Sequence, residues 1–230
     1  MRERPKDEIR AVRVETGWTD TTPGSVLISM GKTRVLCTAS VEDDVPRWMR
    51  GSGKGWVTAE YAMLPGSSND RIHRGHIEGG RAKEISRLIG RALRAVVNMS
   101  ALGERMVRVD CDVLQADGGT RTAAITGAWI ALHDALDSVG ATSAIIDKVA
   151  AISAGIVDGE VLLDLEYESD VAAEVDMNVV MSGRGLLVEV QGTAEGAPFT
   201  REDLDTMLEL AASGITDLVE MQERATASQE

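Results

Sequence analysis

A Gly-Gly-Thr-Arg segment at residues 118–121 separates a strand-like run from an alanine-rich run of helical character. The first N–H groups of a helix lack partners within the helix, and the helix dipole makes that end electropositive. Glycine lets the backbone approach an anion without a Cβ in the way. We therefore predict that Gly119, Thr120 and Arg121 bind an anion, with inorganic phosphate preferred. Taken alone, so short a motif is more often an ordinary strand-to-helix turn with a surface arginine.

A second glycine pair precedes an arginine at another predicted helix start, Gly79-Gly80-Arg81. Arginines from two such starts can form opposite sides of one anion pocket, and we predict this arrangement for Arg81 and Arg121. The glycine-rich stretch at residues 51–55 is not a nucleotide-binding P-loop. In that motif the lysine is followed by Ser or Thr, whereas Lys54 is followed by glycine.

Carboxylates form the other group with chemical potential, within the stretch YESDVAAEVDMN at residues 167–178. An extended chain from Asp170 to Asp176 would place both on one strand face, because their spacing is even. Asp176 is an acid in an otherwise apolar strand. Paired carboxylates can hold Mg²⁺, or one can act as a general acid at a phosphoryl leaving group. The alternative is that these acids line a loop or a solvated sheet edge.

The charge of the chain is unevenly distributed. Its formal net charge is -13, yet residues 47–108 contain 12 Lys and Arg against 5 Asp and Glu. Such asymmetry is typical of a basic surface on an acidic body, although arginines on solvated helices would give the same count. Aromatic residues are only 3% of the chain, so a nucleic-acid surface cannot depend mainly on base stacking.

The remaining composition indicates a globular protein of the cytoplasm. Apolar residues make up 43% of the 230 positions, enough for one large domain or two small ones with a shared core. Cys37 and Cys111 lie far apart in strand-like runs, which favours two buried thiols in a reducing compartment over a disulfide. Neither a signal peptide nor a membrane span is evident at sequence level.

Hydrophobic periodicity predicts the elements that must position these residues. Short strands are expected between residues 12 and 64 and at 105–113, and amphipathic helices at 81–97 and 122–136. The second half predicts hairpins at Asp158-Gly159 and at residues 182–185, and a last helix from Thr200 with Asp203 completing a capping box. We predict an α+β fold of two related lobes, residues 1–141 and 142–230, with mixed sheets packed against helices.

Long strings of this sequence resemble the bacterial ribonuclease PH family, in the same order over nearly the whole chain. They are VPRWMRGSGKGWVTAEYAMLP, GGRAKEISRLIGRALRAVV, VDCDVLQADGGTRTAAITGAWIALHDA, AEVDMNVV and VQGTAEGAPF. The resemblance implies a phosphate-dependent 3′-5′ exoribonuclease, a tRNA nucleotidyltransferase that trims the 3′ ends of transfer-RNA precursors and other RNA. It also implies a homohexameric ring built as a trimer of dimers.

The resemblance extends to individual residues. It implies phosphate binding by Arg81 and by Gly119, Thr120 and Arg121, with inorganic phosphate as co-substrate. Asp170 and Asp176 match the acidic pair of the family, which implies catalysis and Mg²⁺ binding. The loop at residues 65–80 is shorter than in relatives, and its arginine-dense run is reduced to the candidate RNA contacts Arg71 and Arg74.

Two other functions are compatible with parts of the sequence. One is a non-catalytic RNA-binding ring subunit of exosome type, which would be expected to lack the pocket arginines or the acidic pair. The other is a metal-dependent hydrolase that uses water, which would leave the two arginine-bearing glycine turns without a role.

Overall fold

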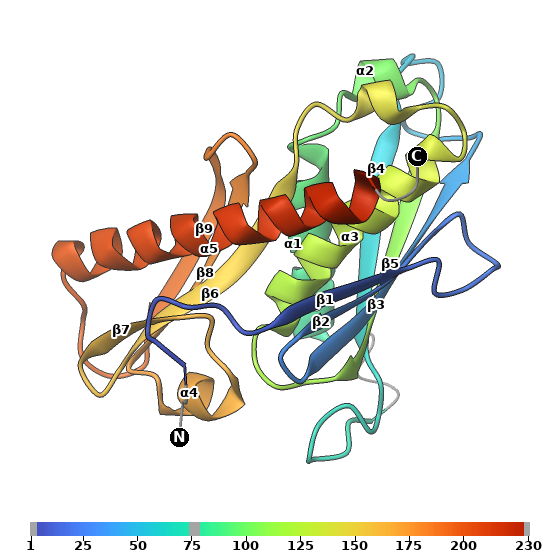
Figure 1. Cartoon of the computed structure of the whole chain (residues 1–230). Coiled ribbons are helices and arrows are strands. Elements are labelled where there is room, and N and C mark those ends of the chain that lie inside the picture. The colour runs from blue at the N-terminus through green and yellow to red at the C-terminus, as the bar shows by residue number, and fades with distance from the viewer. Residues whose placement is uncertain (1–3, 74–78, 228–230) are drawn as a thin grey trace.

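The structure is a computed structural model that describes residues 4–73 and 79–227 (Figure 1). It contains two sheets, a mixed five-stranded one of order β1-β2-β3-β5-β4 and an antiparallel four-stranded one of order β7-β6-β8-β9. The first sheet comprises β1 (Val12–Thr16), β2 (Gly24–Met30), β3 (Thr33–Glu42), β4 (Trp56–Met63) and β5 (Met106–Gln115). The second comprises β6 (Val149–Val157), β7 (Glu160–Leu163), β8 (Val175–Ser182) and β9 (Leu187–Ala194).

The helices connect and cover these sheets. Helix α1 packs on β4, and α5 crosses the second sheet and runs toward α3 (Figure 1). The reciprocal hydrogen bonds of Thr200 and Asp203 confirm the predicted capping box at the start of α5. The described helices are α1 (Gly80–Arg94), α2 (Met99–Leu102), α3 (Thr120–Asp137), the short 3₁₀ helix η2 (Thr142–Ala144), α4 (Tyr167–Ala172) and α5 (Arg201–Ala227).

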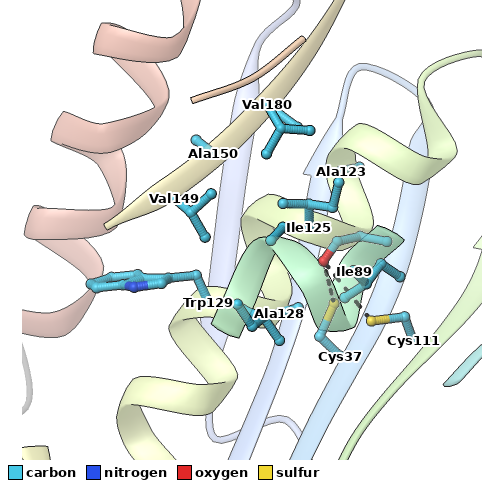
Figure 2. Close-up of a cluster of buried hydrophobic side chains, with 14 of the residues drawn as sticks. Cys37, Ile89, Cys111, Ala123, Ile125, Ala128, Trp129, Val149, Ala150 and Val180 are labelled. Atoms are coloured by element: carbon cyan, nitrogen blue, oxygen red, sulfur yellow. Dashed lines mark hydrogen bonds between the residues drawn. The ribbon is translucent and has the colours of Figure 1, made fainter. Parts of the chain in front are cut away.

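Helix α3 lies between the two sheets and is buried on nearly every side. Small residues make this possible: a Cβ at Gly127 would lie 2.7 Å from Ile28 and 2.9 Å from the Cys37 sulfur. Figure 2 shows side chains of the first sheet, α3 and the second sheet packed in one cluster. The prediction that Cys37 and Cys111 are buried free thiols is confirmed.

Strand periodicity accounts for the first sheet. Val107, Val109, Cys111 and Val113 alternate along β5 and are all buried on the face that the helices cover. Helix α3 follows β5 directly, so the Gly-Gly-Thr-Arg turn lies at the carboxyl end of this strand. None of the helices in the described ranges is long and apolar enough to cross a membrane.

The turns of the second sheet follow their sequence signals. Asp158 and Gly159, with φ angles of 51° and 75°, join β6 to β7 in an antiparallel hairpin. β8 and β9 are joined through Ser182–Gly185, where Gly185 also has a positive φ. Both predicted hairpins are therefore present.

Candidate active site

A polar pocket of about 770 Å³ lies where the end of β5 meets α1, α4 and β8. The residues that line it come from both sheets and lie far apart in the sequence. Arg71 is exposed and is not among the residues that line the pocket, and Arg74 lies outside the described residues. The pocket-lining residues include all six candidates for phosphate and acid chemistry: Arg81, Gly119, Thr120, Arg121, Asp170 and Asp176.

The turn before α3 requires its two glycines. Gly118 and Gly119 have φ angles of 74° and 63°, in the left-handed region that side chains disfavour. A Cβ at Gly118 would also lie 2.4 Å from the carbonyl oxygen of Leu165, in the second half of the chain. The turn therefore brings the start of α3 close to the segment that leads into α4.

A buried ion pair holds this turn in place. The Arg10 guanidinium binds the Asp164 carboxylate through Nε at 2.9 Å and Nη2 at 2.7 Å, and both residues are buried. Its Nη1 donates to the carbonyl oxygen of Asp117 at 2.5 Å. Thr33 adds a hydroxyl that donates to the carbonyl of Gly118 at 2.6 Å and accepts from the Asp117 N–H. Arg10 and Thr33, from two separate segments, thus hold the backbone of the predicted phosphate turn, and Asp164 orients Arg10.

A tyrosine that the sequence analysis did not single out orients Thr120. The Tyr61 hydroxyl, on β4, lies 2.8 Å from the Thr120 hydroxyl. Burial raises the pKa of Tyr61, while the Thr120 hydrogen bond and the charges of Arg81 and Arg121 oppose that rise. The alternation along β4 predicts that Tyr61 is buried. It does not predict Thr120 as its partner, because that contact depends on the tertiary fold.

The two predicted phosphate arginines act on one region. Arg121 is largely buried, and its Nη1 donates to Gln191 at 2.8 Å and lies 3.4 Å from a carboxylate oxygen of Glu84. Arg81 is exposed in the first turn of α1, which has no acidic residue. Both guanidinium charges oppose the burial that raises the pKa of the same groups, Tyr61 and the acids described next. The structure therefore places both arginines beside one pocket.

The acidic pair meets by a different route from the predicted one. Asp170 lies in α4 and Asp176 lies in β8, so the prediction that they share a strand face is wrong. The chain makes a helical turn, with the Asp170 N–H donating to the Glu166 carbonyl at 2.8 Å. It becomes extended only at Ala173, where φ is -66° and ψ is 131°. Both acids nevertheless line the same pocket.

Burial gives these two acids a raised pKa. For Asp170 the desolvation outweighs the opposing charges of Arg81 and Arg121. For Asp176 burial is again the largest cause, and the neighbouring Asp170 charge raises its pKa further. One buried oxygen of Asp176 has no hydrogen-bond partner within the described residues. A carboxyl group in this state is suited to carry a proton or to bind a ligand that completes its coordination.

The donor set also fits Mg²⁺. This ion is commonly held by one or two carboxylates together with water and substrate phosphates. Within residues 4–73 and 79–227, no cluster of three or more His, Cys, Asp or Glu forms a closed cage for a metal. Asp170 and Asp176, which line the same pocket, supply the two carboxylates that such a magnesium site uses.

A cationic turn at a helix start, facing acids of raised pKa in one pocket, defines a class of enzyme that transfers phosphoryl groups. Family models refine this class, since the 3′ exoribonuclease family matches in its domain 1 at residues 8–136 and in its domain 2 at residues 147–214. The chain belongs to this family. The α+β fold and the family predicted from the sequence are both confirmed.

Individual relatives give the same result. The ribonuclease PH proteins of Saccharopolyspora erythraea and Brucella ovis are each 54% identical to this chain, covering 98% and 97% of it and 93% and 98% of their own lengths. Among solved structures, the exosome of Archaeoglobus fulgidus with RNA bound to the active site matches with a TM-score of 0.81 at 20% identity, over 95% of this chain and 90% of that one. Rice Rrp46 matches with a TM-score of 0.78 at 18% identity, over 96% and 97%. These two structures establish the fold alone.

Proposed function

We propose that the pocket carries out phosphorolysis at RNA 3′ ends, chiefly those of transfer-RNA precursors, as expected of a phosphate-dependent 3′-5′ exoribonuclease. The 54% identity to ribonuclease PH proteins supports this activity. The observation that carries the site assignment is the meeting of two arginines, a helix start and two protonatable acids in one pocket. A water-using hydrolase would need no such cationic turn.

In this mechanism the chain's own groups hold the nucleophile. Arg81, Arg121, the Thr120 hydroxyl and the N–H groups at the start of α3 bind inorganic phosphate. Their positive charge screens the repulsion between phosphate and the RNA backbone, so catalysis is mostly positioning and electrostatics. Tyr61 holds the Thr120 hydroxyl at the edge of this site.

The reaction exchanges one bond for another. A phosphate oxygen attacks the phosphorus of the terminal 3′,5′ linkage, and the bond from that phosphorus to the 3′ oxygen of the preceding nucleotide breaks. The terminal nucleotide leaves as a nucleoside 5′-diphosphate. The departing 3′ oxygen takes a proton and becomes the new 3′ hydroxyl, and we assign that proton to the acid pair, with Asp176 as its donor.

As an alternative to proton donation, Asp170 and Asp176 in their ionised form are the residues that would hold Mg²⁺. Bound there, the ion would neutralise charge that develops between the incoming phosphate and the scissile linkage. We further propose that the chain works as a homohexameric ring in the cytoplasm. The resemblance to ribonuclease PH implies the ring, and the two free buried thiols fit a reducing compartment.

A product analysis tests the function. Purified protein, Mg²⁺ and a short RNA are incubated with and without inorganic phosphate, and the released nucleotides are separated. Phosphate-dependent release of nucleoside diphosphates is the expected result. Monophosphates would indicate hydrolysis, and intact RNA that nonetheless binds the protein would indicate a non-catalytic subunit; either result overturns the proposal.

The phosphate site makes its own prediction. Arg121→Ala should raise the KM for phosphate about 100-fold, because it removes a guanidinium from a partly buried anion site. The KM for RNA should change much less. Steady-state rates at varied phosphate measure the effect, with Arg13→Ala as the matched control because Arg13 is an exposed arginine on β1. An unchanged phosphate requirement would remove Arg121 from the site.

A further inference from the structure

An exposed tryptophan lies at the end of the molecule opposite the pocket-facing start of α1. Trp48 is 71% exposed, the highest fraction among the large apolar residues described as exposed. Its ring meets Trp56 edge-to-face, with centroids 5.2 Å apart and planes at 81°. The Arg94 guanidinium lies 4.5 Å from the Trp56 ring centroid and donates to the Val57 carbonyl at 2.9 Å. The partner ring is therefore held from both sides, while the Trp48 ring faces solvent.

The surroundings of Trp48 are polar and contain uncompensated positive charge. Asp44 is paired with Arg50, and Asp43 is paired with Arg105. The exposed side chains of Arg47 and Lys54 make no ion pair within the part of the chain that the structure describes. No other large apolar side chain between residues 42 and 55 is among those described as exposed. A stacking site needs one ring and nearby cations, whereas a protein interface usually needs a contiguous apolar patch.

Helix α1 connects this tryptophan pair to the phosphate pocket. Its first turn carries Arg81, which lines the pocket, and its last residue is Arg94, which covers Trp56. Fifteen helical residues span about 21 Å, which is several nucleotides of single-stranded RNA. Between these ends the helix carries three exposed cations at intervals of four residues, which places them on one face: Lys83, Arg87 and Arg91. Arg91 is paired with Glu189, so Lys83 and Arg87 supply the uncompensated charge.

We propose that the Trp48–Trp56 pair is a second RNA-binding site, where Trp48 stacks on a base several nucleotides upstream of the 3′ end held in the pocket. The inference rests on the proposed function, because RNA is the ligand whose bases and phosphates match an exposed ring beside cations. The α1 cations carry the backbone between the two sites.

The test compares Trp48→Ala with the native chain on single-stranded RNAs of increasing length, without phosphate so that no RNA is consumed. Affinity should fall about tenfold for RNAs long enough to reach from the pocket past α1, and stay unchanged for the shortest ones. Trp18→Ala is the matched control, since Trp18 is 47% exposed but lies beside β1, at the opposite edge of the first sheet. Trp48→Phe should keep most of the affinity, because it retains a ring.

Each outcome decides the matter. A length-dependent loss, with phosphorolysis of short RNA retained, supports the site. An unchanged affinity, or an equal loss at all lengths, overturns it. A changed sedimentation coefficient with native RNA affinity also overturns it and assigns Trp48 to contact with a second copy of the chain. If the native chain itself showed no phosphorolysis, the proposed function would be contradicted instead.

Discussion

Replacing Asp176 with asparagine is expected to abolish turnover almost completely while making the protein more stable. The activity should fall by about 10² to 10⁴, the usual contribution of a positioned general acid. Asparagine keeps the shape of the side chain but cannot give a proton to the departing 3′ oxygen. Nucleoside diphosphate release at saturating phosphate and RNA measures this loss.

The stability gain follows from the raised pKa of Asp176. As the pH rises above the ordinary aspartate pKa of 3.8, Asp176 loses its proton in the unfolded chain first. In the folded chain it loses the proton only at the higher pKa. Ionisation therefore costs stability as pH rises through this window, and the cost persists at neutral pH. Removing the carboxylate should raise Tm by a few degrees, since about 1 kcal/mol corresponds to roughly 2–4 °C in a chain of this size. The gain should disappear as the pH is lowered below 3.8.

Glu174→Gln provides the matched control, because Glu174 is an exposed acid two residues before Asp176. It should leave both turnover and Tm close to native values. If Asp176→Asn retained turnover, the proton would have to come from elsewhere. If Asp176→Asn lowered Tm at neutral pH, the ionised carboxylate of Asp176 would be stabilising the folded chain, and the argument from its raised pKa would be wrong.

The phosphate side of the site could be predicted from sequence because its chemistry is local. Gly118, Gly119, Thr120 and Arg121 are consecutive, and the periodicity around them marks where a strand ends and a helix begins. A backbone amide site at a helix start needs little more than that boundary. The second arginine could be predicted for the same reason, since α1 begins one residue before Arg81.

The acid side and the supporting contacts could not be predicted in the same way. Asp170 and Asp176 were expected on one strand face, but Asp170 lies in the helix α4 (Tyr167–Ala172), and the chain becomes extended only after it. Tyr61 reaches Thr120 only because α3 packs on the sheet that contains β4. Arg10 and Asp164 are 154 residues apart, and no local pattern pairs them. Contacts of this range are decided by the tertiary fold.

That distant pair leads to the second large effect. Arg10→Ala should destabilise the protein by about 3–5 kcal/mol, because it removes the main ion-pair partner of the buried Asp164 carboxylate. Among the described residues, that carboxylate would keep only the N–H of residue 10 and the Arg4 guanidinium, 4.0 Å away. The carbonyl of Asp117 would lose its guanidinium donor as well, so the turn before α3 would be less well held. Urea denaturation measures the loss, and the exposed Arg13→Ala variant is the control.

The pH dependence and a second variant separate this ion pair from general damage to the core. Burial pushes the pKa of Asp164 upward, but the hydrogen bonds and charge of Arg10 outweigh it and hold that pKa below 3.8. The pair therefore stabilises the native chain above pH 3.8 and loses its contribution as the pH falls further, so the native chain and Arg10→Ala should converge in acid. At neutral pH, adding Asp164→Asn to Arg10→Ala should recover part of the lost stability, since it removes the buried charge that Arg10 no longer compensates. A double variant no more stable than Arg10→Ala would mean that the charge of Asp164 is not what the arginine compensates.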